Sequence, residues 1–251
     1  MGLPPLAPLE MSLRASDGLI LKGTLTYPPA SPGAPSPLAI LAHQYPATRD
    51  SFAPLVHDLL QRGVATLAFD QRGHGASTEG PHGPVVIESP ADFEDLAFHH
   101  AFVGSITGVG FYRIDDDIVR AAAWGAAQNF IDASRLALVG ASVGGSGVLL
   151  AAPRVHGLRA IATVGAAGAP AFGEDAPQRI RTALEQGSVP AYLASARDDA
   201  FDGGANVAAW SAGLTHVSTR IVDGRAHAMA IYFDVRDELL GFLESNLSFR
   251  S

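Results

Sequence analysis

Short runs of consecutive apolar residues alternate with amphipathic stretches over most of the chain. A run that is apolar at every position is typical of a strand buried on both faces, as in a parallel sheet covered by helices. A stretch with an apolar residue at every third or fourth position is typical of a helix packed on such a sheet. Strands are therefore predicted at 38–43, 64–70, 135–142, 158–166, 189–199 and 215–227, and helices at 52–63, 114–131, 144–153, 203–213 and 230–247.

The N-terminal stretch 9–28 has a different pattern. Apolar and polar residues alternate on both sides of Asp17-Gly18, which indicates a β-hairpin. After it, strands and helices alternate, which indicates a mostly parallel sheet with helices on both faces. We therefore predict a single α/β domain over residues 1–251, with an antiparallel hairpin at its N-terminus.

The stretch 79–113 interrupts this alternation, because it is far longer than a strand-to-helix turn requires. Ser89 is a typical N-cap, Pro90 suits the first helical position, and Asp92 stands three residues after the cap. A helix is therefore predicted within 89–106, followed by a loop over 107–113. Ligands of such sheets bind at the carboxyl ends of the strands. The insertion is expected at that end, where it would form one wall of a binding site.

Composition narrows the possible chemistry. The chain has no cysteine, which excludes disulfides, thiol catalysis and cysteine-ligated zinc. Its formal net charge of -8 argues against non-specific nucleic-acid binding. No apolar run approaches the about 20 residues of a membrane span. The N-terminus lacks the basic and apolar segments of a signal peptide, so a cytoplasmic location is expected.

A glycine-flanked serine stands between a predicted buried strand and a predicted helix, in the pattern Gly140-x-Ser142-x-Gly144. This is the context that the G-x-S-x-G nucleophile motif requires. Small neighbours permit a sharp turn that lifts the hydroxyl above the sheet, and the first amides of the following helix favour a developing negative charge. The pattern predicts Ser142 as a nucleophile. The alternative is a packing turn without chemistry.

A serine nucleophile needs a base, and the chain has nine histidines. His227 stands at the carboxyl end of the last predicted strand, where a base is expected. His216 begins that strand and therefore lies at the opposite edge of the sheet. His57 lies inside a predicted helix, and nothing in the sequence fixes the positions of His99 and His100 within the insertion. His227 is the predicted base.

The imidazole needs a carboxylate that fixes its tautomer. Asp198 and Asp199 both end the strand that precedes the histidine strand. We favour Asp199, with Asp198 as the alternative and Asp202 as a further candidate.

A tetrahedral oxyanion needs two hydrogen-bond donors. The backbone N–H of Val143, directly after the serine, is the first. The second is expected from the loop after the strand 38–43, where by position it is the N–H of Tyr45. Two alternatives remain for Tyr45: its hydroxyl is the donor, or its side chain only lines the pocket.

Five stretches together carry a resemblance to a known family. They are LAHQYPATRDSF from 41, AFDQRGHGAST from 68, LALVGASVGGS from 136, LASARDD from 193 and DGRAHA from 223. In this order they resemble the oxyanion loop, the following strand and turn, the nucleophile turn, the acid loop and the histidine loop of the α/β-hydrolase superfamily. His43-Gln44 in place of His-Gly, with no large cap, is most similar to the dienelactone-hydrolase-like and small serine-esterase branch.

The resemblance implies an α/β-hydrolase fold without a large lid domain and a Ser142–Asp199–His227 triad in the chain order of that superfamily. It also implies that Arg72 and His74 are structural. Ser142 stands where dienelactone hydrolases have a cysteine, so their substrate is not carried over.

The expected function is hydrolysis of carboxylic esters with small or medium acyl groups, through an acyl-enzyme on Ser142 and without a cofactor. Thioesterase, peptidase or acyltransferase activity with the same triad is an alternative, as is a non-catalytic binding protein on the same fold. The acids Asp115, Asp116 and Asp117 are expected to begin a helix. A loop of glycine-spaced oxygen ligands is absent, so no metal is expected. The expected partner is a small-molecule ester, with no nucleic acid and no membrane span.

Overall fold

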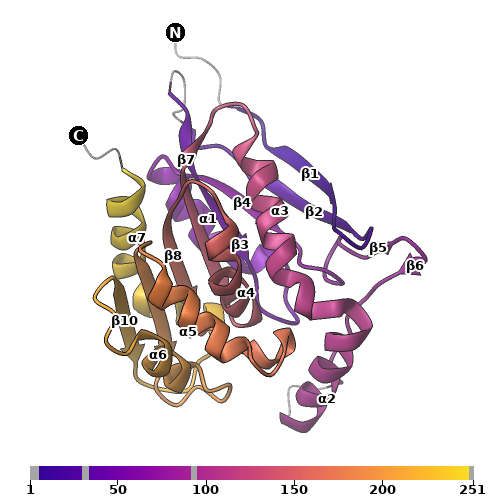
Figure 1. Ribbon diagram of the computed structural model, residues 1–251. Coiled ribbons are helices and arrows are strands. Elements are labelled where there is room, and N and C mark those ends of the chain that lie inside the picture. Colours follow the sequence, from indigo (N-terminus) through magenta and orange to yellow (C-terminus); the bar gives the residue numbers. More distant parts are fainter. Residues whose placement is uncertain (1–5, 30–33, 92–94, 249–251) are drawn as a thin grey trace.

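A mixed β-sheet forms the centre of the computed structural model, which describes residues 6–29, 34–91 and 95–248 (Figure 1). Ten strands make up the sheet in these ranges. They are β1 (Leu9–Arg14), β2 (Ile20–Thr26), β3 (Ser36–Ala42), β4 (Ala65–Phe69), β5 (Glu79–Gly80), β6 (Gly83–Pro84), β7 (Ile131–Ala141), β8 (Leu158–Val164), β9 (Ala191–Ala196) and β10 (Val217–Val222).

The strand order across the sheet is β10-β9-β8-β7-β3-β4-β2-β5-β6, with β1 beside β2. The strands from β10 to β4 in this order are parallel. The predicted N-terminal hairpin is confirmed, because β1 and β2 pair antiparallel around the turn at Asp17-Gly18. After β3 the chain moves first to β4 and later to β7 on the other side. The loops that follow β3 and β7 therefore diverge, and such a point is where ligands enter sheets of this kind.

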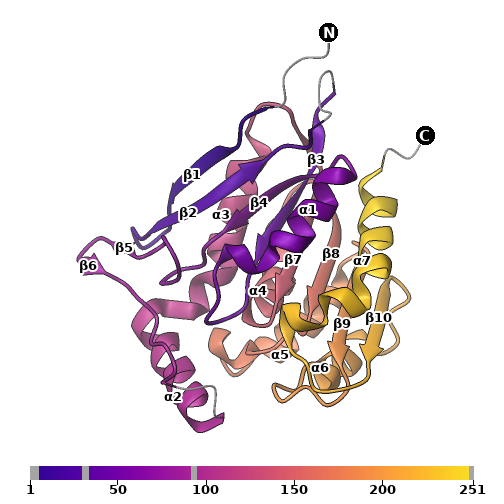
Figure 2. The ribbon, with the colours of Figure 1, turned by 180° about the vertical axis from the view of Figure 1, so that it is seen from behind.

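Helices cover both faces of the sheet, as predicted. They are α1 (Ala53–Gln61), α2 (Asp95–Ser105), α3 (Ile114–Ala126), α4 (Val143–Ala151), α5 (Ala176–Gln186), α6 (Gly203–Ser211) and α7 (Tyr232–Leu247). Helices α3 to α6 lie on the face seen in Figure 1, and α1 and α7 lie on the face seen in Figure 2. Alternate residues of β3 point to opposite faces. Leu38 and Ile40 accordingly belong to the core under α3 and α4, whereas Ala39 and Leu41 belong to the core under α1 and α7.

The predicted helix 114–131 is too long. Helix α3 ends at Ala126, and the chain turns so that β7 begins at Ile131. Phe130, in that turn, has φ 65°, a left-handed conformation that a right-handed helix does not contain. The carbonyl of Phe130 accepts a hydrogen bond from Ser36 N–H, which ties the turn to the start of β3.

The helix predicted within 89–106 is confirmed as α2, but its predicted start and the loop predicted over 107–113 are wrong. The described part of α2 begins at Asp95, and Ser89-Pro90 is not helical; Asp92 lies outside the described residues. The carbonyl of Glu88 accepts hydrogen bonds from Tyr45 and Ser105, which holds this stretch extended.

The predicted loop 107–113 is helical. It forms a π turn over Ile106–Gly110 and a 3-10 turn over Phe111–Arg113. Val109 and Phe111 are buried, so tertiary packing overrides the local preference of the two glycines in this stretch.

The other predicted helices, α1, α4, α6 and α7, lie close to their predicted positions, whereas α5 (Ala176–Gln186) was not predicted. None of the helices in the described ranges is both long and apolar enough to cross a lipid bilayer.

Candidate active site

Three loops at the carboxyl ends of parallel strands bring a serine, a histidine and an aspartate into one hydrogen-bonded chain. Ser142 follows β7, Asp199 lies three residues after β9, and His227 lies five residues after β10. The Nε2 atom of His227 is 2.8 Å from Ser142 Oγ, and its Nδ1 atom is 2.8 Å from Asp199 Oδ2. A carboxylate only accepts hydrogen bonds, so Nδ1 carries the proton and Nε2 accepts the hydroxyl proton of Ser142.

Ser142 stands on a tight turn between β7 and α4. Its φ is 52° and its ψ is -123°, a backbone conformation that non-glycine residues rarely adopt. Helix α4, which follows, is buried along its whole length and holds the turn in the core. A Cβ atom at Gly144 would overlap the carbonyl oxygens of Ala42 and His43. Glycine at this position therefore lets the first turn of α4 contact the end of β3.

The carboxylate of Asp199 is fully buried and fully hydrogen-bonded. Its Oδ2 accepts from His227 and from Ser195 Oγ at 3.3 Å, and its Oδ1 accepts from Phe201 N–H at 2.9 Å. Asp198, the alternative acid, is exposed. Asp202 is the N-cap residue of α6. The structure therefore brings Asp199, and neither of the other two acids, to the imidazole.

The loop that carries His227 passes close to the end of β8, where a glycine leaves room for it. A Cβ atom at Gly165, directly after β8, would lie 2.6 Å from Ala228 N and 3.3 Å from His227 Nδ1. The side chain of His227 is 19% exposed, whereas that of Asp199 is 0% exposed. The imidazole can thus be reached from outside the protein, while its carboxylate partner cannot.

The first amides of α4 and the loop after β3 lie together beside Ser142. Val143 begins α4, so its N–H has no partner within the helix. The backbone of Tyr45 belongs to the loop 43–46, next to the carbonyls that Gly144 contacts. The hydroxyl of Tyr45 points away, because it donates to Glu88 O at 2.5 Å. Its backbone, rather than its hydroxyl, is thus available beside the serine.

Another histidine, His43, is fully buried and fixes this loop. His43 Nδ1 is 2.9 Å from Gln44 O, and its Nε2 accepts from Gln71 N–H at 2.9 Å. Burial lowers the pKa of His43 to about 4. The ring is therefore neutral at pH 7 and carries its proton on Nδ1. This pairing joins the loop after β3 to the turn after β4.

Arg72 and His74 in that turn are buried in structural roles. Arg72 donates twice to Asp117, at 2.7 and 3.0 Å, once to Asp17 at 2.9 Å and once to Val109 O at 3.1 Å. Burial lowers the pKa of His74 to about 3, and its Nδ1 is 2.9 Å from Arg72 O.

The acid triplet lies in the first turn of α3 and forms ion pairs with arginines. Within the ranges that the structure describes, no group of three or more His, Asp or Glu side chains is arranged to hold a metal ion.

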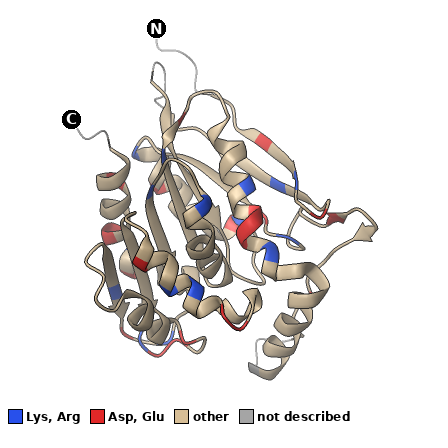
Figure 3. Cartoon of the chain, viewed as in Figure 1, with Lys and Arg blue, Asp and Glu red and all other residues tan. Residues whose placement is uncertain are grey.

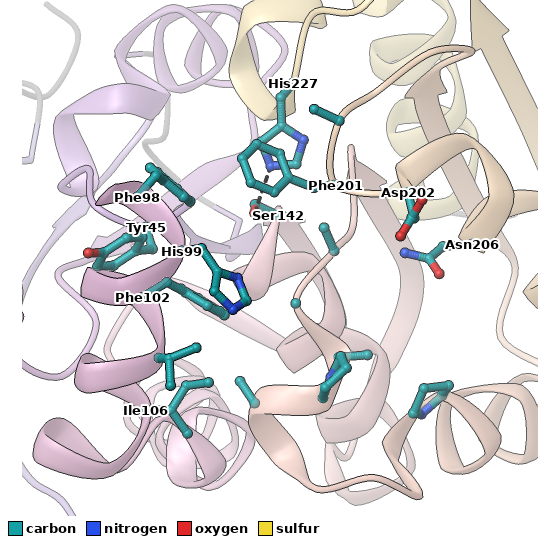
Figure 4. A pocket seen from close by; sticks show the side chains of 18 of the residues that line it. Tyr45, Phe98, His99, Phe102, Ile106, Ser142, Phe201, Asp202, Asn206 and His227 are labelled. Atoms are coloured by element: carbon teal, nitrogen blue, oxygen red, sulfur yellow. Dashed lines mark hydrogen bonds between the residues drawn. The ribbon is translucent and has the colours of Figure 1, made fainter. Parts of the chain in front are cut away.

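A pocket of about 760 Å³ opens beside Ser142 and His227 (Figure 4). Its walls come from α2, from the segment 167–171 with Pro177, from the loop 200–202 with Asn206, and from the ring of Tyr45. The ring of Phe201 lies 4.5 Å from that of His227 and 5.1 Å from that of Phe98 on α2. The insertion 79–113 forms one wall of the pocket, as expected from its place at the ligand end of the sheet. The individual apolar side chains of α2 and Phe201 were not predicted, because the sequence does not show which positions of the insertion face the site.

The other histidines lie elsewhere or contribute only to the rim. His216 precedes β10, at the opposite edge of the sheet, where its Nε2 is 3.0 Å from Leu184 O. His57 lies in α1. His99 lines the pocket from α2, whereas His100 is exposed and is not among the lining residues.

Three solved structures with the same fold share little sequence identity with this chain. A putative dienelactone hydrolase from Klebsiella pneumoniae is 17% identical with a TM-score of 0.70, and the alignment covers 94% of this chain and 98% of that one. The esterase domain of a Rhodothermus marinus protein is 18% identical with a TM-score of 0.65, covering 96% and 100%. An S-formylglutathione hydrolase from Agrobacterium tumefaciens is 15% identical with a TM-score of 0.65, covering 99% and 100%.

No curated protein matches the chain. The family model for the alpha/beta hydrolase fold matches residues 37–197, which is more than half of the sequence. That range includes the loop after β3, Ser142 and the strand that leads to Asp199. The chain therefore belongs to the α/β-hydrolase family, as its sequence motifs predict.

Proposed function

We propose that the protein is a serine hydrolase that cleaves carboxylic esters. The observation that carries this proposal is the continuous hydrogen-bonded chain from Ser142 through His227 to the buried Asp199, which ends in an apolar pocket. A base within hydrogen-bond reach of a hydroxyl, oriented by a third group, is the arrangement that activates a serine.

In this mechanism Ser142 Oγ attacks the acyl carbonyl of the bound ester while His227 Nε2 takes the hydroxyl proton. The backbone N–H groups of Val143 and Tyr45 stabilise the oxyanion of the tetrahedral intermediate. His227 then returns the proton to the departing alcohol, which leaves an acyl group on Ser142. A water molecule, deprotonated by His227, hydrolyses this acyl-enzyme and restores the serine.

Asp199 acts on the histidine and not on the substrate. It holds the proton of the neutral imidazole on Nδ1 and stabilises the imidazolium that forms during each half-reaction. Its burial excludes water as a competing partner, and its bonds from Ser195 and Phe201 keep the carboxylate in place.

The size of the pocket favours esters of small or medium acyl groups. Its volume of about 760 Å³ falls in the range of roughly 300–1,000 Å³ that is usual for sites of drug-sized ligands. The lining side chains are mostly aliphatic or aromatic, which suits the apolar part of an ester.

The test is hydrolysis of p-nitrophenyl esters from acetate to long acyl chains. We expect turnover by the wild type, a loss of at least about a thousandfold in kcat for Ser142→Ala, and a loss of about 10⁴-fold for Asp199→Asn. Asp198→Asn is the matched control, because it removes an exposed neighbouring acid, and it should retain activity within about twofold. Product analysis with an added alcohol separates hydrolysis from acyl transfer.

Two results would overturn the proposal. One is a wild-type protein that is inert towards every ester and towards a serine-directed phosphonate probe. The other is a Ser142→Ala variant that keeps wild-type turnover. Equal losses in Asp198→Asn and Asp199→Asn would contradict the role of Asp199 alone.

A further inference from the structure

The pocket has two sides of different chemistry. On the α2 side, the residues from Leu96 to Ser105 include no Lys, Arg, Asp or Glu, and Figure 3 shows this helix without charged positions over that stretch. Phe98, Phe102 and Ile106 face the cavity from this side (Figure 4). His99 is the one polar side chain that lines the cavity from α2, and the rest of this side suits an uncharged, apolar portion of a substrate.

The opposite side carries hydrogen-bond acceptors at the start of α6. Asp202 and Asn206 lie beside one another there and both line the pocket (Figure 4). Asn206 uses its amide N–H to donate to Ala166 O at 3.3 Å, which leaves its side-chain oxygen as an acceptor. Asp202 is exposed at the mouth of the pocket, and its carboxylate has no hydrogen-bond or ion-pair partner within the described residues.

No positive charge balances Asp202 inside the pocket. Among the described residues that line the cavity, Asp202 is the only Asp or Glu, and none is Lys or Arg. A carboxylate on a substrate would therefore meet a like charge without a counter-ion. An ammonium group would meet an unpaired carboxylate and a second acceptor oxygen.

We propose that Asp202 and Asn206 form a specificity site that selects amine-bearing esters over carboxylate-bearing ones. The apolar remainder of such a substrate lies along α2, and the ester carbonyl lies at Ser142. This inference rests on the proposed ester hydrolysis and adds the charge class of the substrate.

The chain offers a matched pair of acids for the test. Asp202→Asn removes the pocket charge while keeping the shape of the side chain. Asparagine also tolerates the left-handed backbone of this position, where φ is 59°. Asp198→Asn removes an equal charge from the same loop; like Asp202 it is exposed, but it does not line the pocket. Any effect of overall charge is common to both variants.

The experiment measures kcat/KM at pH 8, above the range in which histidines ordinarily carry charge. One substrate series varies the acyl group of p-nitrophenyl esters: hexanoate, 6-aminohexanoate and the monoester of adipate. A second series keeps a hexanoyl group and varies the alcohol: hexanol, 6-aminohexanol and 6-hydroxyhexanoate. The two series cover both sides of the ester bond, and each rate is divided by that of the neutral ester.

We expect the wild type to prefer the amine to the carboxylate substrate in at least one series. In Asp202→Asn the ratio of kcat/KM for the amine substrate to kcat/KM for the carboxylate substrate should fall by about tenfold. The variant loses one partly screened charge that attracts the amine and repels the carboxylate. In Asp198→Asn the ratio should change by less than about twofold.

The absence of charge preference in both series, or an equal loss in the two variants, overturns the specificity site while the neutral ester is still hydrolysed. Failure of the wild type to hydrolyse the neutral esters would instead overturn the proposed function itself. The two failures are thus distinguishable.

Discussion

At the scale of single residues, the position of Gly144 controls how closely α4 approaches β3. A methyl group there would overlap the carbonyl oxygens of Ala42 and His43. We predict that Gly144→Ala destabilises the fold by about 1–3 kcal/mol, because the backbone of one element must shift. The loop that carries Tyr45 would move with it, so kcat towards esters should fall more than KM changes. Denaturant unfolding and steady-state kinetics measure both effects.

Gly241 provides the control for this substitution. It lies on an exposed face of α7 with open space around a built Cβ. Gly241→Ala should stabilise the protein by up to about 1 kcal/mol and leave the kinetics unchanged. A Gly144→Ala variant with wild-type stability and kcat would contradict the inference that α4 contacts β3 closely at this position.

The sequence predicted the placement of the candidate site residues well wherever a motif fixed the local backbone conformation. The structure joins Ser142 to His227, each of which follows the end of a strand as predicted. The sequence could not separate Asp198 from Asp199, because adjacent acids in a turn have the same pattern. Only the turn geometry, in which Phe201 N–H binds one carboxylate, turns Asp199 inward.

At the scale of elements, Arg72 joins three segments that are distant in sequence. It binds Asp117 in α3, Asp17 in the β1–β2 turn and the carbonyl of Val109. Removing Asp117 would leave a buried guanidinium without its main partner, which costs about 3–5 kcal/mol. We therefore predict that Asp117→Leu lowers the free energy of unfolding by this amount, measured by urea denaturation.

The double variant Arg72→Met/Asp117→Leu removes both charges. It should recover part of the loss, because no buried charge then remains unpaired. Asp116→Ala serves as the control, since its ion pairs with Arg120 and Arg154 are partly exposed and are worth about 1 kcal/mol or less. A double variant less stable than Asp117→Leu would contradict this account.

Helix α2 defines one wall of the pocket, and Phe102 is the part of it that we expect to limit substrate length. The Phe102 ring packs 5.3 Å from that of Tyr45 and comes close to Gly168 on the far wall. We predict that Phe102→Ala raises the preference for long over short acyl chains by about tenfold, because it opens space for additional methylenes. The p-nitrophenyl ester series measures this ratio.

The control for Phe102 is Phe233→Ala, which truncates an exposed phenylalanine that does not line the pocket. Its chain-length profile should match that of the wild type. An unchanged profile in Phe102→Ala would mean that long acyl chains do not extend along α2.

Element boundaries were the least predictable level. The apolar spacing of 114–126 continues through Phe130, so the sequence pattern has no signal for the turn that ends α3. Glycines in 107–113 favoured a loop, yet burial of Val109 and Phe111 makes the stretch helical. Both errors have one cause: tertiary contacts outweigh local preference where the difference is about 1 kcal/mol per residue.

At the scale of the whole molecule, the alternation of strands and helices predicted the sheet type but not the strand order. A strand buried on both faces has the same apolar pattern wherever it lies in a sheet. The placement of β3 between β4 and β7 therefore follows from three-dimensional packing alone. Because β3 and β7 are adjacent, the loops that follow them begin side by side. Tyr45 lies in the loop after β3, and Ser142 lies in the turn after β7.

The two helices on the second face are connected by a network that spans most of the chain. Asp58 of α1 accepts from Arg236 of α7 at 2.6 and 2.7 Å and from Tyr232 at 2.6 Å. The hydrogen bonds and charge of Arg236 lower the pKa of Asp58 to about 2. Since the carboxylate binds protons less readily in the folded state, its contribution to stability is present above about pH 4 and is lost as the pH falls towards 2.

We predict that Asp58→Asn lowers the free energy of unfolding by about 2 kcal/mol at pH 7, because it removes a nearly buried, ion-paired carboxylate. The difference from the wild type should shrink as the pH falls from 4 to 2, where the wild-type carboxyl becomes protonated as well. Urea denaturation at pH 7, 4 and 2.5 measures it. Asp237→Asn, an exposed neutralisation on the same helix, should change stability by less than about 0.5 kcal/mol at each pH. If the difference in the free energy of unfolding between the wild type and Asp58→Asn stayed constant from pH 7 to 2.5, the shape of the side chain, rather than the charge of Asp58, would join α1 to α7.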